Sequence, residues 1–276
     1  MLNEPRFAVS FFDDPPSNLA AEELLRERAG RGAETLALYV NKHSLIIGRN
    51  QDLNQELTGE AMAEGVPSYR RKTGGGAVYH DEGNLNWSFA VPGGLERRAE
   101  LLSWLIDALR PLAPGLVADG RLALRDGPFK IGGSAAAAGG GTLLFHGTLL
   151  VESDVAKLGR YLRAHRSAVQ GRRAADGQAE DYAPRAAVRS VGSAVASLVD
   201  LYPAASLAAC VDAIARAVGR EPVELASIVD PAEIKTRSLS YHDENRTRGP
   251  WPPAHTTAIE ESHERPRSHE RISLPA

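Results

Sequence analysis

The sequence contains a single cysteine, Cys210, among 276 residues. One cysteine cannot form an internal disulfide, and it cannot build a cysteine-based zinc site. Cys210 lies within an Ala-rich, helix-like segment, Ala208 to Ala217. We therefore expect it to be a small core residue rather than a reactive nucleophile.

Long apolar runs are also missing, since no stretch approaches the roughly 20 residues needed to cross a bilayer. The first residues, Met1 to Arg6, lack the apolar segment of a secretory signal. A formal net charge of -3 provides little of the strongly basic surface that nucleic-acid binding requires. We expect a soluble cytoplasmic protein with no membrane and no nucleic acid as a partner.

The chain does have enough apolar residues, 43% of 276, to bury a full core. We expect one domain over residues 1–250, with a surface loop at 170–189 that orders around a ligand. Residues 251–276 are rich in charge and proline, which predicts a disordered tail and leaves no material for an accessory domain. The histidines at 242, 255, 263 and 269 have no metal-site spacing.

The hydrophobic periodicity predicts an α+β fold, because strands gather in the first 151 residues and do not alternate regularly with helices. Ser17 and Asn18 are placed as the N-cap of the first helix, and the runs 35–40 and 44–47 are interpreted as a hairpin. The other strands are expected at 66–71, 85–91, 122–124, 128–132 and 142–151. Helices are expected at 19–28, 55–64, 101–109, 154–164, 190–199 and 206–218.

The most informative segment runs from Arg70 to Asn84 and combines a cationic pair, three glycines, a histidine and an acid. Glycine leaves backbone amides uncovered, and arginine adds a planar, permanent charge. An ordinary flexible turn would need neither the Arg70-Arg71 pair nor His80-Asp81. This composition indicates a loop that binds a phosphate or a carboxylate.

Two further motifs carry polar chemistry. Lys130 precedes Gly132-Gly133-Ser134 and can point at a ligand that the backbone also approaches, although most lysines only solvate a surface. His146 and Thr148 interrupt the otherwise apolar strand 142–151. His146 can be either a hydrogen-bonded structural residue or a catalytic one.

Together these motifs resemble those of the lipoate–protein ligases, in the superfamily that includes biotin–protein ligases and octanoyl transferases. The resemblance covers about residues 5–250. It implies a class II synthetase-like fold of mixed and antiparallel sheets flanked by helices. The matching segments are Asn18 to Glu23, Ile47 to Gln51, Arg70 to Asn84, Lys130 to Ser134, His146 to Leu150, and Arg189 to Val191 with Val195 and Leu198.

The resemblance implies that lipoate or octanoate is activated by ATP, with Mg²⁺, to an acyl-adenylate. A lysine of a partner protein then displaces AMP to form an amide. The partners it implies are lipoyl domains of 2-oxoacid dehydrogenase complexes or the glycine-cleavage H protein, with a possible separate accessory subunit. The wording of the glycine and His-Gly-Thr-Leu-Leu motifs favours lipoate over biotin.

The same resemblance assigns Lys130 as the catalytic cation and as a nucleotide and acyl-carboxyl contact. Substrate contacts fall to Arg70, Gly74 and Gly75 at the acyl head group, and to His80 and His146. We expect His80 and Asp81 to orient rather than catalyse, and an apolar acyl slot lined by Leu45, Ile47, Val78 and the strand Leu143 to Leu150. The nucleotide-contacting positions are Arg71, Gly76, Ala77, Val78, Tyr79 and Lys130.

The chain departs from the family pattern at Ala123, where an acid is common, so Asp119 or Asp126 is expected to substitute. The run Ala135 to Gly141 is expected to be a flexible loop that replaces a common arginine. These departures keep two alternatives open. One is transfer from a preformed acyl-adenylate without ATP, and the other is a catalytically weakened acyl- or nucleotide-binding protein.

Overall fold

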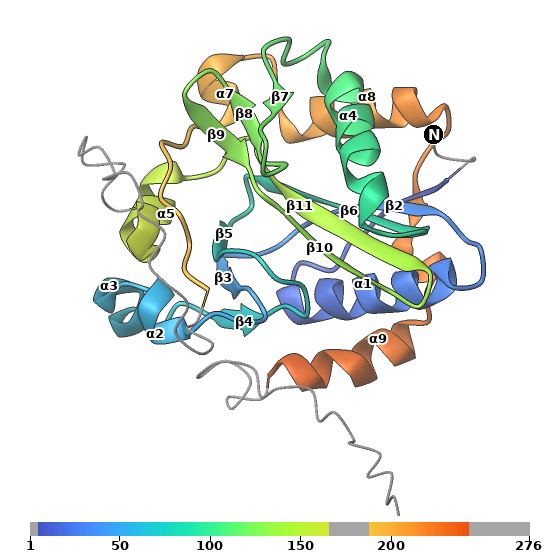
Figure 1. Cartoon of the computed structure of the whole chain (residues 1–276), viewed down its shortest axis with the longest axis horizontal. Coiled ribbons are helices and arrows are strands. Elements are labelled where there is room, and N and C mark those ends of the chain that lie inside the picture. Colours follow the sequence, from blue (N-terminus) through green and yellow to red (C-terminus); the bar gives the residue numbers. More distant parts are fainter. Residues whose placement is uncertain (1–4, 166–187, 243–276) are drawn as a thin grey trace, which may run out of the picture.

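The computed structural model describes residues 5–165 and 188–242. The predicted tail at 251–276 and nearly all of the predicted loop at 170–189 lie outside these residues. The fold is α+β, as expected, and contains three sheets flanked by helices (Figure 1). Within the described ranges no helix is both long and apolar enough to cross a membrane.

The largest sheet has six strands in the order β10-β11-β6-β2-β1-β12. It is mixed, because β1 pairs in parallel with β2 and β12 while the remaining pairs are antiparallel. In chain order these strands are β1 (Arg6–Val9), β2 (Thr35–Val40), β6 (Asn84–Pro92), β10 (Ser134–Gly139), β11 (Thr142–Leu150) and β12 (Val223–Glu224).

Two three-stranded sheets complete the β structure. One has the order β4-β3-β5, from β3 (Ser44–Ile47), β4 (Ser68–Arg70) and β5 (Val78–His80). The other has the order β7-β8-β9, from β7 (Val117–Ala118), β8 (Leu124–Asp126) and β9 (Phe129–Gly132).

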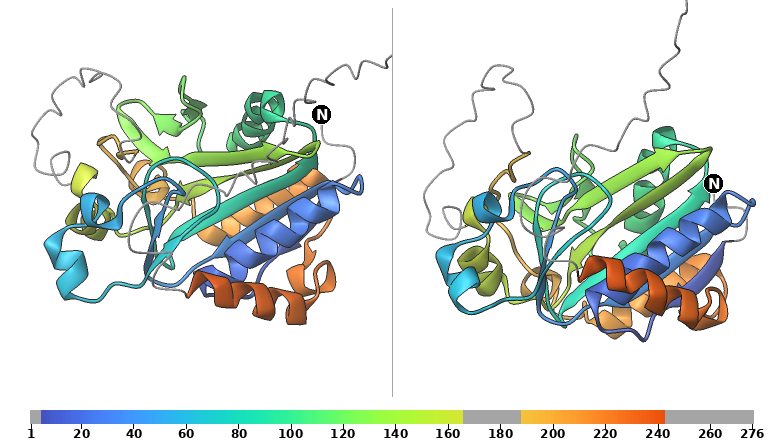
Figure 2. Two further views of the ribbon diagram at one scale, coloured as in Figure 1. Left: turned by 60° about the horizontal axis from the view of Figure 1, so that its bottom comes forward. Right: turned by 90° about the horizontal axis from the view of Figure 1, so that it is seen from below.

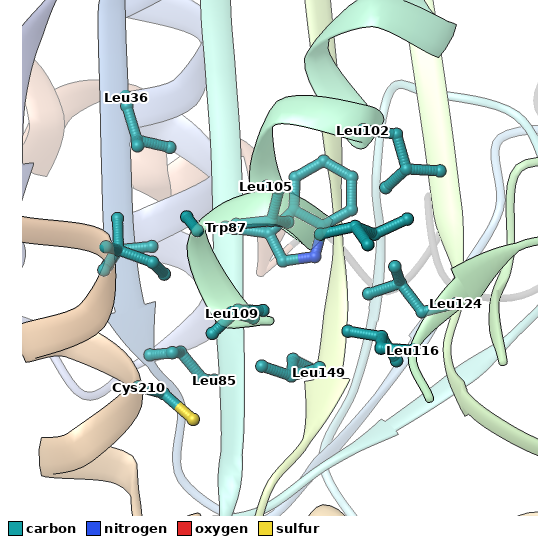
Figure 3. Close-up of a cluster of buried hydrophobic side chains, with 14 of the residues drawn as sticks. Leu36, Leu85, Trp87, Leu102, Leu105, Leu109, Leu116, Leu124, Leu149 and Cys210 are labelled. Atoms are coloured by element: carbon teal, nitrogen blue, oxygen red, sulfur yellow. The ribbon is translucent and has the colours of Figure 1, made fainter. Parts of the chain in front are cut away.

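Helices cover both faces of the large sheet. On one face α4 (Arg98–Leu109) and α8 (Leu207–Val218) enclose the main apolar core (Figures 1 and 3). On the other face α1 (Pro15–Ala29) and α9 (Pro231–Ser238) lie side by side (Figure 2). The shorter helices are α2 (Leu53–Glu56), α3 (Gly59–Ala63), α5 (Val155–Tyr161), α7 (Leu198–Leu201), η1 (Leu95–Arg97), η2 (Leu225–Ser227) and η3 (Leu239–Tyr241).

The alternation of side chains along β6 explains why helices pack on both faces of the large sheet. Leu85, Trp87 and Phe89 face the core under α4, where the Trp87 indole lies among leucines (Figure 3). The alternate residues Asn86 and Ser88 are buried too, at 2% and 0% exposure, because α1 covers that face. The strand predicted at 85–91 is therefore buried on both sides, and its polar residues face α1.

The first helix begins earlier than predicted. Asp14 is its N-cap and accepts a bond from the Ser17 amide at 2.9 Å, with two prolines in the first turn. Pro15 and Pro16 fit there because these positions need no amide donor. Asn18, which was predicted to cap, is instead 1% exposed inside the first turns.

The predicted hairpin of 35–40 with 44–47 is wrong, since β2 and β3 belong to different sheets. Its connection is anchored by the buried Asn41 and by the Lys42 amide, which donates to the Asp13 carbonyl. These contacts direct the chain away from β2. The helix predicted at 55–64 is also divided in two, because Thr58 caps α3 and interrupts the run.

The alanine-rich run at 135–141, predicted to be a flexible loop, forms β10 and a tight turn. Gly140 and Gly141 have φ of +61° and +72°, the left-handed values that a two-residue hairpin turn needs. β10 then pairs along its length with β11, so that Ser134 lies opposite Gly147. Backbone hydrogen bonds to β11 therefore order this segment, although its alanine and glycine residues do not by themselves predict a strand.

Gly147 lies where the backbone meets the Trp87 indole. A Cβ built there would come within 2.4 Å of Trp87 Cζ2 and within 2.4 Å of the Gly133 carbonyl oxygen. We expect Gly147→Ala to lower the free energy of unfolding by about 1–3 kcal/mol, because overpacking forces neighbours to move. Urea unfolding followed by tryptophan fluorescence measures this change.

The matched control is Gly59→Ala at the start of α3, where a Cβ would meet nothing within 4 Å. Its free energy of unfolding should stay within about 0.5 kcal/mol of the wild type. Equal effects of the two substitutions would contradict the packing explanation.

Candidate functional site

A cavity of about 710 Å³ lies where the three sheets meet. Its walls come from α1, from strands of all three sheets (β2, β3, β5, β6, β8, β9, β10 and β11), from the glycine loop, from the turn 119–123, and from an extended segment at 189–193. The cavity therefore collects residues that are far apart in the sequence.

The glycine loop forms one wall and is organised by Arg71. Arg71 is 5% exposed, and its Nη2 donates to the carbonyls of Gly74 at 2.6 Å and Gly76 at 2.8 Å. Gly75, with φ of +89°, approaches Gly48 so closely that a Cβ on Gly48 would meet the Gly75 oxygen at 2.0 Å. Gly75, Gly76, Ala77 and Val78 line the cavity, as the sequence predicts for an anion-binding loop.

The Arg71 guanidinium is also held by the Thr73 hydroxyl and the Ile46 carbonyl. Burial lowers the pKa of Arg71 to about 10, partly offset by Glu22 and Tyr39. The side chain is therefore still charged at neutral pH, and loop carbonyls surround the charge in place of water.

Arg70, Gly74 and Tyr79 are not on the cavity wall. The Nη1 of Arg70 donates to the carbonyls of Gly48 at 3.0 Å and Gln51 at 2.6 Å, so its charge supports the neighbouring loop. Strand alternation turns Tyr79 toward a separate apolar cluster, where its hydroxyl meets His43 Nδ1 at 2.9 Å.

Lys130 lies on β9 with its side chain in the cavity wall. Its backbone is bridged to Val195, because the Lys130 amide donates to the Ala194 carbonyl at 2.8 Å. Burial lowers the pKa of the Lys130 ammonium, Asp119 opposes this, and Arg125 and Arg71 add to it. Within residues 5–165 and 188–242, Lys130 Nζ makes no hydrogen bond or ion pair.

Cations outnumber acids around the cavity. Besides Arg71 and Lys130 its wall includes Arg121, Arg125 and Arg189, whereas Asp119 is the one carboxylate that the described residues place there. Of the two acids expected to substitute for the one missing at Ala123, Asp119 lines the cavity and Asp126 does not. Asp126 pairs with the Tyr202 hydroxyl, away from this wall.

The Asp119 carboxylate is itself well held. Its Oδ2 accepts from Arg125 Nε at 2.9 Å, and its Oδ1 accepts from the amides of Arg121 and Ala123 at 2.8 and 3.0 Å. These bonds lower the pKa of Asp119 although burial opposes them. Among the described residues no cluster of three or more His, Cys, Asp or Glu could hold a metal without help from a ligand.

A buried polar network around His146 also borders the cavity. His146 Nδ1 meets Glu22 Oε2 at 2.7 Å, and its Nε2 meets the Thr73 hydroxyl at 2.7 Å. Glu22 also accepts from the Tyr39 hydroxyl at 2.9 Å. Both ring nitrogens of His146 are occupied, which favours the hydrogen-bonded role among the two that its sequence context leaves open.

His80 also lines the cavity and is 4% exposed. Its Nδ1 lies 2.9 Å from Asn41 Nδ2. Burial, reinforced by Arg71 and His146, lowers the pKa of His80 to about 3, so the ring is neutral at neutral pH. The adjacent Asp81 accepts from the amides of Gly83 and Asp154 and thereby joins the β5–β6 turn to the start of α5, consistent with an orienting role.

The predicted acyl slot is partly wrong. Leu45 and Ile47 pack into the separate cluster around Tyr79, because in β3 the residue between them, Ile46, faces the cavity. In β11, Leu143 and Leu149 belong to the core under α4, and the cavity receives His146 to Thr148 instead. The larger apolar side chains of the wall are Leu19, Tyr39, Ile46, Val78 and Val191.

The helix predicted at 190–199 is wrong up to residue 197, since α7 begins only at Leu198. The extended residues 189–193 close one side of the cavity instead. The Ser190 hydroxyl accepts from the Ala77 amide at 2.8 Å, and the Ser190 amide donates to the Glu56 carboxylate. Gly192 is required by close contact, since a Cβ there would meet the Ala164 oxygen at 2.1 Å. Gly192, inside the predicted helix 190–199, was the sequence feature that argued against that helix.

The chain matches the family described as the lipoyl protein ligase A/B catalytic domain over residues 14–219. It is 36% identical over 161 residues to a lipoate-protein ligase A of Psychrobacter cryohalolentis, covering 58% of this chain and 48% of that protein. The chain spans about half the length of the curated relatives it matches.

Two solved structures share the fold. A lipoate-protein ligase A bound with ATP aligns with a TM-score of 0.65 and 21% identity, covering 90% of this chain and 98% of that one. The bi-partite lipoate protein ligase of Thermoplasma acidophilum, described together with its E2 lipoyl domain, aligns with a TM-score of 0.64 and 22% identity, covering 90% and 96%.

Two buried histidines predict how stability depends on pH. Burial lowers the pKa of His80 to about 3 and of His165 to about 4. An unfolded histidine titrates near pH 6.5, so below that pH the unfolded chain binds more protons than the folded one. This contribution to stability is therefore complete above about pH 6.5 and is lost as the pH falls toward about 4.

Urea unfolding at several pH values between about 7.5 and 4.5 measures this loss. His165→Gln should show a smaller decrease than the wild type over the same range. The matched variant His242→Gln, at an exposed position, should retain the wild-type pH dependence. Parallel curves for all three proteins would contradict the assignment to His165.

Proposed function

The chain belongs to the lipoyl protein ligase A/B catalytic domain family, and we propose that it joins lipoate, or the related octanoate, to a lysine of a lipoyl domain through an acyl-adenylate. The observation that carries this proposal is that the cavity wall combines a surplus of positive charge with apolar side chains. Some wall residues are charged or belong to the glycine loop, with five cations against the single carboxylate of Asp119 among the described residues, and others, such as Leu19, Ile46 and Val78, are apolar. An acyl chain with a carboxylate beside a nucleotide has the same division of charge and apolar surface.

In the first step the acyl carboxylate attacks the α-phosphate of ATP, and pyrophosphate leaves. Two anions must approach each other, so fixed cations and amides have to offset their repulsion. Lys130 Nζ is suited to the reacting groups, because it lies in the wall and has no partner among the described residues. The glycine loop from Gly75 to Val78 is suited to the nucleotide, with Arg71 fixing its shape.

Arg121, Arg125 and Arg189 add charge at the same wall and would attract the remaining phosphates. A contact from Tyr79 to the nucleotide stays a prediction, as do contacts from Arg70 and Gly74 to the acyl head group. The ATP-bound ligase of the same fold supports the nucleotide assignment.

In the second step the lysine amine of the partner attacks the acyl carbonyl, and AMP leaves. Negative charge grows on the carbonyl oxygen and on the departing phosphate, and a single ammonium at Lys130 can stabilise both. The incoming amine has a solution pKa of about 10.4 and must lose a proton before it attacks. Nothing in the described residues assigns a base for that proton.

Mg²⁺ would enter with the triphosphate, which supplies most of its ligands in such sites. Asp119 is the carboxylate that could complete them, since it lies on the cavity wall and is ionised. Its fit is limited by the Arg125 ion pair, which must open or shift to release an oxygen. The metal would neutralise phosphate charge there.

A second candidate function is transfer from a supplied acyl-adenylate without ATP. The small side chain of Ala123 favours it, because this wall lacks the acid that is common in the family at that position. A catalytically weakened acyl- or nucleotide-binding protein is the third possibility.

For the partner we propose a lipoyl domain of a 2-oxoacid dehydrogenase complex or the glycine-cleavage H protein, encountered in the cytoplasm. The Thermoplasma ligase, described with an E2 lipoyl domain, supports this class of partner. That ligase is bi-partite, which also supports a separate accessory subunit for this chain.

One assay separates the three functions. The purified chain is incubated with ATP, Mg²⁺, lipoate or octanoate and an apo lipoyl domain, and the mass of the domain is followed. A mass increase that requires ATP supports the ligase, and an increase only from supplied lipoyl-AMP selects the transferase. Ligand binding without any product selects the binding protein.

Lys130→Ala should reduce the rate of acyl transfer at least about 100-fold, because both steps lose the same cation. Mass spectrometry of the lipoyl domain measures the rate, and circular dichroism confirms the fold. Lys72→Ala is the control, since Lys72 pairs with Glu23 outside the cavity and should retain the wild-type rate. A Lys130→Ala protein with full activity would exclude the proposed role.

A further inference from the structure

A chain of buried amides ends on His80 and determines where its proton lies. Asn18 Nδ2 donates to the Phe12 carbonyl at 2.9 Å, which fixes the orientation of the Asn18 amide because a carbonyl can only accept. Its Oδ1 then accepts from the Ser10 hydroxyl at 2.7 Å. The same Nδ2 also donates to Asn41 Oδ1 at 2.8 Å, which fixes the second amide.

The orientation of Asn41 decides the tautomer of His80. Since Asn41 Oδ1 is an acceptor, its Nδ2 faces His80 Nδ1 at 2.9 Å and donates to it. A neutral imidazole whose Nδ1 accepts must carry its proton on Nε2. The relay from Phe12 therefore presents His80 Nε2 as a hydrogen-bond donor.

That donor has no partner. Among the described residues, His80 Nε2 is the one buried side-chain nitrogen or oxygen without a hydrogen bond whose residue also lines the cavity. An unpaired buried donor is unfavourable, so a bound molecule that offers an acceptor gains affinity there.

The position of His80 indicates which part of a ligand it meets. Val78 and His80 are alternate residues of β5 and both line the cavity, together with Leu19, Tyr39 and Ile46. Lys130 on β9 and Arg125 on β8 belong to a different sheet, and Arg121 lies in the turn that precedes β8. A carboxylate held at Lys130 directs its apolar chain toward Val78 and His80.

We propose that His80 determines acyl specificity by donating from Nε2 to an acceptor at the far end of the bound chain. This inference rests on the proposed function for the class of ligand. The sulfur atoms of the lipoate ring are weak acceptors, whereas the end of octanoate has none. His80 thus favours a sulfur-bearing chain over a plain hydrocarbon of the same length.

Calorimetry of lipoate and octanoate binding without ATP tests the inference. The measured quantity is the change in the ratio of their Kd values on mutation, because the two acids also differ in apolar surface. His80→Phe should lower the preference for lipoate about fivefold, mainly through weaker lipoate binding. His80→Gln, which keeps an N–H donor, should restore part of the preference.

Val78→Ala is the matched control, since it alters the same wall without a donor and should weaken both ligands alike. An unchanged ratio in a folded His80→Phe protein overturns the inference and leaves the proposed function intact. Failure of the wild type to bind either acid overturns both.

Nitrogen-15 NMR of labelled histidine tests the tautomer independently of binding. His80 should appear neutral and protonated at Nε2 near neutral pH. A ring protonated at Nδ1 overturns the inference, whatever the affinities.

Discussion

The burial of the Arg71 guanidinium is the constraint on which the rest of the site depends. A buried cation is tolerated only when its donors are satisfied, and here the carbonyls of Ile46, Gly74 and Gly76 satisfy them. Those bonds fix the glycine loop, which in turn presses Gly75 against Gly48. Contacts within the protein therefore shape the loop, and under the proposed function its amides need little rearrangement to bind an anion.

The Arg71 guanidinium also belongs to a buried hydrogen-bonded network that borders the cavity. Arg71 bonds to Thr73, Thr73 to His146, and His146 to Glu22, so cation and carboxylate terminate one buried network. The Arg71–Thr73 step lies within the glycine loop, and the next two steps join that loop to β11 and β11 to α1, which supplies the acid. The network therefore links helix α1 to the glycine loop. Removing a member deprives each neighbour of one buried hydrogen bond.

The sequence was most informative where a motif carries local chemistry, as at Gly75 to Val78 and Lys130, and where strand periodicity is strong, as in β6. It was least informative about residues whose partners are distant. Asn18 looks like a cap because its long-range partner Asn41 is invisible in the sequence, and Leu45 looks like a wall residue because alternation alone does not say which face is the cavity. The alanines of β10 became a strand only through pairing with β11. Arg70 and Arg71 are neighbours of one type, yet only tertiary contacts show that one supports a loop and the other lines the site.

The solitary thiol has a consequence for a substrate that carries a strained disulfide ring. Thiolates attack disulfides, so a reactive cysteine near lipoate would open the ring and trap the substrate as a mixed disulfide. Cys210 is fully buried under α4 beside Leu85 (Figure 3), and burial raises the pKa of its thiol to about 12. If lipoate is the substrate, its disulfide ring therefore meets no reactive thiol of this chain. Any reduction of the ring then depends on other molecules.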